Sequence, residues 1–200
     1  MGGVRVIAVT DRACLVEVED AAAAASLATW ARAAGPAAVD VVPAAGTVLF
    51  DGVEPALVEA ALPSWPRQPV SSRGTVIEVP VTYDGPDLET VARHWGCTVG
   101  DVVEQHTSLD FVALFCGFAP GFSYLAGLPG DRPVPRLASP RPRVAPGSVA
   151  LADAWCGIYP SASPGGWLVI GTTDAVLWDP DRAEPALLAP GTRVRFEAVR

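Results

Sequence analysis

Residues 115–125 read FCGFAPGFSYL, and residues 157–167 read GIYPSASPGGW. Both stretches set glycine and proline among aromatic residues. Proline fixes φ and removes an N–H donor, whereas glycine permits positive φ and close approach of the backbone. The aromatic rings beside them supply flat apolar walls. Together the two stretches predict the rim of a preformed pocket.

The sequence around these stretches predicts a mainly-β C-terminal domain over residues 75–200. A helix begins at Asp87 and ends at Gly96, and a second begins at Thr98, where Asp101 completes a capping box. Short strands broken by glycine and proline follow, a spacing typical of a closed barrel or sandwich. Strand patterns cover residues 75–81, 111–115, 148–151, 167–171, 175–178 and 192–198.

The N-terminal third predicts a small α+β domain over residues 1–70. Strand patterns at 4–9, 13–18, 38–42 and 47–50 combine with helices at 21–34 and 54–62 in the order ββαββα. Asp20 is positioned to cap the first helix. Residues 63–74 contain three prolines and no apolar periodicity, so we expect an extended connector and a domain boundary there.

Composition narrows the class of protein. Half of the 200 residues are hydrophobic, so the chain is globular, and its net charge of -8 makes nucleic acid and membranes unfavourable partners. The absence of lysine excludes Schiff-base chemistry and the lysine-dependent phosphate loop. Four scattered cysteines without a Cys-x-x-Cys pair, and no secretion leader, predict reduced thiols and a cytoplasmic location.

His106 is the candidate catalytic acid or base, because histidine titrates near neutral pH and this one lies on the apolar helix face of Val99, Val102 and Val103. The alternative is a core histidine bonded to a backbone carbonyl, which is the commoner role for such a residue. Proximity to the rim would favour the catalytic role.

Metal and thiol chemistry are not indicated. The spacing of His94, Cys97, His106 and Cys116 matches no standard zinc pattern, so we predict no metal site. Cys116 and Cys156 each flank one rim stretch, but a nucleophilic thiol needs an activating partner, and we expect both to be small buried residues.

Arg141 and Arg143 alternate with Pro142 and so lie on one side of an extended strand. Two guanidinium groups in this arrangement suit a carboxylate or phosphate through bidentate hydrogen bonds. A solvated strand edge that deters pairing explains them equally well.

The rim residues belong to a longer series of motifs that resembles the allophanate hydrolase subunit 1 family, also called the sporulation kinase inhibitor family. The series covers most of the chain in collinear order. It comprises DRA at 11–13, IEVPV at 77–81, GFAPGFSYL at 117–125, PRLASPR at 135–141, PGSV at 146–149, GIYP at 157–160, SPGGW at 163–167 and LLAPGTRVRF at 187–196.

The resemblance implies an α+β N-terminal domain followed by a cyclophilin-like β-barrel. It also implies a non-autonomous subunit of a heteromeric, ATP-dependent 5-oxoprolinase, which opens 5-oxo-L-proline to L-glutamate. Its implied partners are a second subunit of homologous fold, of the allophanate hydrolase subunit 2 type, and a third subunit, the A component of that enzyme. ATP, as its Mg complex, would act in the assembly without binding tightly to this chain. The expected substrate-binding residues are Phe118, Pro120, Gly121, Phe122, Tyr124, Arg141, Arg143, Tyr159, Ser163, Gly165, Gly166 and Trp167.

Two other functions are compatible with the same resemblance. One is a carboxyltransferase or allophanate-hydrolase-type subunit for urea-like amides, which requires a biotin carrier. The other is a regulatory inhibitor of a sensor histidine kinase, in which the aromatic surface serves as an interface.

Overall fold

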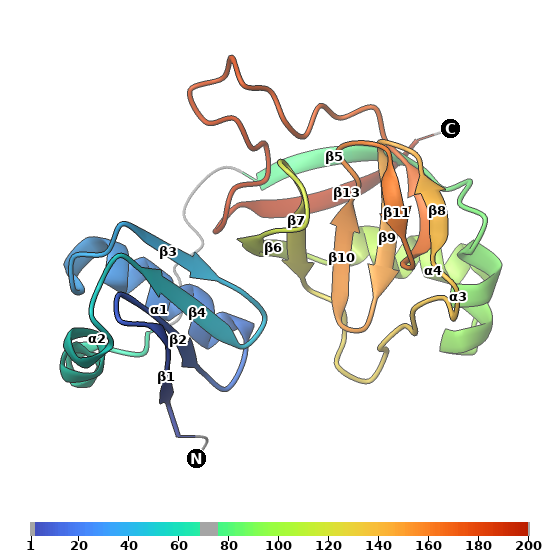
Figure 1. Ribbon diagram of the computed structural model, residues 1–200. Helices are drawn as coiled ribbons and strands as arrows, with labels where there is room; N and C mark the ends of the chain where they lie inside the picture. The colour runs from blue at the N-terminus through green and yellow to red at the C-terminus, as the bar shows by residue number, and fades with distance from the viewer. Residues whose placement is uncertain (1–2, 69–75, 200) are drawn as a thin grey trace. The chain divides into compact units, whose positions relative to one another are not determined.

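The computed structural model describes residues 3–68 and 76–199, and the chain divides into two compact units, Met1–Ser71 and Ser72–Arg200 (Figure 1). The division falls inside the predicted connector, of which residues 69–74 lie outside the described residues.

The first unit is a sheet covered by helices, as the predicted α+β pattern requires. Strands β1 (Arg5–Thr10), β2 (Ala13–Glu17), β3 (Asp40–Pro43) and β4 (Thr47–Asp51) pair antiparallel in the order β1-β2-β4-β3. Helix α1 (Ala21–Ala34) packs on β3 and β4, and α2 (Pro55–Ala61) contacts β1. The predicted cap is confirmed, because the Asp20 carboxylate accepts the Ala23 N–H at 2.8 Å.

The start of the predicted connector is wrong, because residues 63–68 belong to the first unit. Leu62–Ser64 forms a 3-10 helix, η1, directly after α2. Trp65 is buried in the core of this unit, and its indole N–H donates to the Ser26 hydroxyl at 3.1 Å. The prolines obscured this pattern in the sequence, because they suggested an extended chain where the tryptophan anchors it.

The second unit contains a closed β-barrel, which confirms the predicted fold class. Its strands follow the order β10-β7-β6-β13-β5-β12-β9 around the barrel. They are β5 (Val76–Thr82), β6 (Phe111–Cys116), β7 (Ser123–Ala126), β9 (Ser148–Ala152), β10 (Trp155–Ile158), β12 (Leu168–Thr172) and β13 (Arg193–Val199). The pair β5–β13 is parallel, and the other barrel pairs are antiparallel. Inward residues such as Phe111, Leu151 and Phe196 form the core.

Two helices accompany the barrel and begin where the sequence predicts. Helix α3 (Leu88–Trp95) ends at Gly96, which adopts the left-handed conformation with φ 66°. Helix α4 (Val99–Ser108) begins with the Thr98–Asp101 capping box. In Figure 1 the two helices lie beside each other, and α3 contacts β12 while α4 contacts β13. Val102 and His106 of α4 are buried, but Val99 is exposed, so the predicted apolar face is narrower than its spacing suggested.

The strand predicted at 175–178 is wrong. This segment belongs to the loop between β12 and β13, where Trp178 forms an isolated bridge with Ala186. Val176 and Trp178 are exposed, while Leu177 is buried, so the alternation reflects a loop anchored by one apolar side chain. The prediction also missed the strands β7, β10 and β11 (Ser163–Gly165), which overlap the two glycine- and proline-rich stretches.

Candidate functional site

The candidate site lies on the outer face of the barrel, under a second layer of chain. Along β9, Val149 and Leu151 face the barrel core, whereas Ala150 and Ala152 belong to a separate cluster with Tyr159. This explains why all of β9 is buried, since both of its faces are covered. Strand β8 (Arg141–Val144) pairs with β11 as a two-stranded sheet beside this cluster. The small alanines let aromatic rings approach the barrel wall.

The turn between β6 and β7 carries two aromatic residues, Phe118 and Phe122, whose rings pack against Tyr159 of this cluster. It is closed by the hydrogen bonds Gly117 N–H to Phe122 C=O at 3.2 Å and Phe122 N–H to Ala119 C=O at 2.9 Å. Gly121 has φ 84°, in the left-handed region that favours glycine. Phe118 has φ 69° although it is not glycine, and the residue is 61% exposed. A bulky residue held in this region carries backbone strain, which is commonest at functional sites.

Aromatic rings from both rim stretches meet in one pocket of about 400 Å³. Phe122 lies edge-on to Tyr159 and Trp167, with centroid distances of 5.4 Å in both pairs. Tyr124 completes the wall, 5.6 Å from the Trp167 ring. The pocket is lined by Phe118, Phe122, Tyr124, Arg136, Leu137, Ala138, Pro140, Tyr159, Pro164, Gly165, Gly166 and Trp167.

Close packing fixes the base of the pocket. A Cβ at Gly165 would overlap the Tyr159 hydroxyl, and one at Gly157 would lie 2.9 Å from the Phe122 ring. Both positions therefore need glycine for the rings to sit where they do. Burial raises the pKa of Tyr159, while the Trp167 N–H and the charges of Arg136 and Arg141 lower it. The phenol thus stays protonated at neutral pH and can donate a hydrogen bond.

Arg136 is a pocket residue that the sequence prediction missed. It lies within the PRLASPR motif, five residues before the arginine chosen there. Its backbone is held on both sides, because Val134 exchanges hydrogen bonds with Asp153, and the Leu137 N–H donates to the Gly166 C=O at 2.7 Å. The available signal was the motif itself, in which this arginine precedes two apolar residues of the same pocket wall.

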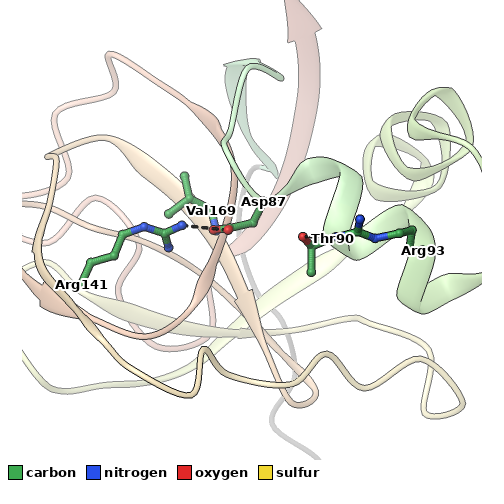
Figure 2. Close-up of polar contacts among 5 residues, drawn as sticks. All are labelled: Asp87, Thr90, Arg93, Arg141 and Val169. Carbon is green, nitrogen blue, oxygen red and sulfur yellow. Dashed lines mark hydrogen bonds and ion pairs between the residues drawn. The ribbon is translucent and has the colours of Figure 1, made fainter.

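Arg141 forms an ion pair within the barrel unit, and its predicted contact with substrate stays a prediction (Figure 2). Its Nη2 donates to the Asp87 carboxylate at 2.8 Å, and the other oxygen of that carboxylate accepts the Val169 N–H at 2.7 Å. Asp87 directly precedes α3, so this one carboxylate connects the start of α3 to β8 and β12. Arg141 therefore pairs with Asp87 through Nη2 and does not line the pocket, while its Nη1 is buried without a hydrogen-bond partner among the described residues.

The structure places seven of the twelve predicted substrate-binding residues in the pocket lining and five outside it. Seven line the pocket: Phe118, Phe122, Tyr124, Tyr159, Gly165, Gly166 and Trp167. Pro120, Gly121, Arg141, Arg143 and Ser163 lie outside the lining. Arg143 is exposed on β8. The Ser163 hydroxyl is buried without a hydrogen-bond partner among the described residues.

His106 is fully buried, among the rings of Phe111 and Phe196 and apart from the pocket lining. Its Nδ1 lies 2.7 Å from the Tyr83 hydroxyl and its Nε2 lies 3.5 Å from the Cys156 sulfur. Burial lowers the pKa of His106 to about 3 and raises the pKa of Tyr83 and of Cys156. The three groups are therefore neutral at pH 7, and the catalytic role of His106 stays a prediction that this geometry does not favour.

Residues 3–68 and 76–199 contain no group of three His, Cys, Asp or Glu residues that could hold a metal ion. None of its helices is both long enough and apolar enough to cross a bilayer.

The family of the chain is shown by its sequence. Residues 4–188 match the carboxyltransferase domain, subdomain C and D, family, and the chain belongs to it. Three relatives, each named as the B-type subunit of 5-oxoprolinase, confirm the predicted resemblance. The protein from Escherichia coli O157:H7 is 50% identical over 123 residues, which cover 60% of this chain and 56% of that one. The protein from Haemophilus influenzae is 40% identical over 144 residues, which cover 70% and 68% of the two chains. The Bacillus subtilis protein is 41% identical over 124 residues, which cover 60% and 52%. The chain thus spans little more than half the length of two of these relatives.

Solved structures carry the same architecture. TTHA0988 is 35% identical with a TM-score of 0.76, and the match covers 94% of this chain and 40% of that chain. A conserved uncharacterized protein from Pyrococcus horikoshii is 32% identical with a TM-score of 0.60, and the match covers 98% and 97%. The Kluyveromyces lactis urea amidolyase is 19% identical with a TM-score of 0.73, over 98% of this chain and 15% of that one, a likeness that shows the fold alone.

Proposed function

We propose that this chain is a non-autonomous subunit of an ATP-dependent 5-oxoprolinase, and that its aromatic pocket forms part of the site where 5-oxo-L-proline is opened to L-glutamate. The observation that carries the proposal is the pocket itself. It is built from residues 118–167, inside the family match, and the chain is 40–50% identical, over 123–144 residues, to proteins named as 5-oxoprolinase subunits of the B type.

The pocket suits a small ring. A volume of about 400 Å³ exceeds that of a five-membered lactam, so the substrate leaves room for a group from a partner. The rings of Phe122, Tyr124 and Trp167 offer flat apolar surface to its methylene face. The phenol of Tyr159 and the guanidinium of Arg136 offer donors to its polar atoms.

The chemistry requires groups that this pocket lacks. Among the described residues that line it there is no histidine, cysteine, aspartate, glutamate or serine. A lactam resists attack by water until its oxygen is activated, and we propose that transfer of the γ-phosphoryl group from ATP activates it. One water then opens the ring to an acyl phosphate, and a second releases phosphate and leaves glutamate. The nucleotide and the catalytic acid–base groups would come from partner subunits, and for this reason we propose that the chain is not autonomous.

The test is reconstitution. The chain is purified with the products of its neighbouring genes, and glutamate release from 5-oxoproline is measured with ATP, without ATP, and with each protein omitted in turn. We expect release that needs ATP and disappears when this chain is omitted. Full activity without this chain, or no activity from an assembled complex, would contradict the proposal.

A further inference from the structure

The most informative group in the pocket is the guanidinium of Arg136. It is the one charged side chain among the described residues that line the pocket. The remaining lining is aromatic, aliphatic, proline or glycine. A single fixed charge at the edge of an apolar cavity determines which end of a ligand enters beside it.

Arg136 has no counter-ion among the described residues, whereas four of the eight arginines within residues 76–199 pair with a carboxylate. Within residues 76–199, Arg141 pairs with Asp87, Arg182 with Asp179, and Arg193 and Arg195 with Asp110. No ion pair or side-chain hydrogen bond involves Arg136 in the described part of the chain. The chain carries a net charge of -8, so acidic residues are plentiful, yet none pairs with this guanidinium. Its donors are therefore available to an external anion.

The position of Arg136 is fixed by the backbone on both sides. Two hydrogen bonds between Val134 and Asp153, and the bond from the Leu137 N–H to the Gly166 C=O, hold the segment against the barrel and against the pocket wall. The charge of Arg136 acts on the Tyr159 hydroxyl at the base of the pocket. A guanidinium whose backbone is already fixed loses less conformational freedom when it binds a ligand.

We propose that Arg136 is the substrate-specificity residue of this pocket and binds the carboxylate of a small cyclic substrate whose ring lies against Trp167 and Phe122. This inference rests on the proposed function, in which that substrate is 5-oxoproline. The planar fork of arginine matches a carboxylate with two parallel N–H···O bonds. A neutral lactam without the carboxylate has no partner for this charge and is excluded from productive binding.

The experiment compares Arg136→Gln and Arg136→Lys with the wild-type chain in the assembled complex. Glutamine removes the charge and keeps hydrogen-bonding capacity, and lysine keeps the charge without the fork. We expect Arg136→Gln to raise KM for 5-oxoproline about 10- to 100-fold, the range for losing charge-assisted hydrogen bonds. Arg136→Lys should recover part of that loss, and KM for ATP should not change in either variant.

Arg93→Gln is the matched control. It removes the same charge from the exposed surface of α3, where the Arg93 guanidinium lies beside Thr90 and donates to its hydroxyl at 3.0 Å, outside the pocket lining (Figure 2). This variant should keep wild-type kinetics. An unchanged KM for 5-oxoproline in Arg136→Gln, or a rise in KM for ATP alone, would overturn the inference, the latter by assigning Arg136 to a phosphate.

Direct binding separates this inference from the proposed function. Saturation-transfer NMR on the assembled complex without ATP compares 5-oxoproline with 2-pyrrolidinone, the same lactam without its carboxylate. We expect transfer to 5-oxoproline alone, and its loss in Arg136→Gln but not in Arg93→Gln. If the wild-type complex binds in this manner but does not hydrolyse 5-oxoproline, the proposed function fails and the role of Arg136 stands. Equal binding of both lactams, or binding of neither, overturns the role of Arg136.

Discussion

Replacing Asp87 with asparagine should destabilise the barrel unit by about 2–3 kcal/mol. The carboxylate accepts one hydrogen bond from Arg141 and one from the Val169 N–H, and its side chain is 8% exposed. Loss of one partner from a fully buried ion pair costs about 3–5 kcal/mol. The Arg141 side chain is 29% exposed, so water partly solvates the guanidinium in the variant, and asparagine keeps the bond from Val169. Both effects reduce the expected cost.

The assay is urea unfolding followed by tryptophan fluorescence. With an m-value of about 2 kcal/mol/M, a loss of 2–3 kcal/mol lowers the midpoint by about 1–1.5 M. Hydrogen exchange at the Val169 amide reports the same loss locally. Asp84→Asn is the control, because exposed Asp84 accepts only from the Thr172 hydroxyl at 3.1 Å and should change stability by less than about 0.5 kcal/mol. If the two variants unfold at the same urea concentration, the role assigned to the Asp87–Arg141 pair is refuted.

Three further predictions concern the pocket, its loop and the barrel core. Gly165→Ala should displace Tyr159, cost about 1–3 kcal/mol by overpacking and lower kcat/KM of the complex, whereas Gly130→Ala, which meets nothing within 4 Å, should do neither. Gly121→Val should lower the Tm, because a β-branched residue is strained at φ 84°, and an unchanged Tm would contradict this. Stability should fall as pH drops from about 6.5 towards 3, because unfolding lets His106 take up the proton that burial denies it. Urea midpoints measured across this range should depend less on pH in His106→Gln than in the wild-type chain.

The features predictable from the sequence were those set by local chemistry. The cap at Asp20, the Thr98–Asp101 capping box and the end of α3 at Gly96 each depend on residues within a few positions of one another. The aromatic composition of the rim was also visible, and the structure brings rings from both stretches together. Strands β7, β10 and β11 were missed, because glycine and proline there indicate turns while pairing with distant strands determines the conformation.

The polar contacts depended on residues far apart in the chain. Arg141 and Asp87 are 54 residues apart, so no local pattern indicated that this arginine already has a partner while Arg136 does not. The partners of His106 are 23 and 50 residues away, and they make this histidine part of a neutral core cluster. The residue types suggested arginine contacts for an anion, but only the packing showed that Arg141 pairs with Asp87, that Arg143 is exposed on β8, and that Arg136 lines the pocket.

The most direct test of the pocket's role is a crystal structure of the assembled complex with 5-oxoproline. We expect ligand density in this chain's pocket, with the ring against Trp167 and the carboxylate on Arg136. Density for 5-oxoproline elsewhere in the complex, with this pocket filled by a segment of another protein of the complex, would contradict that role.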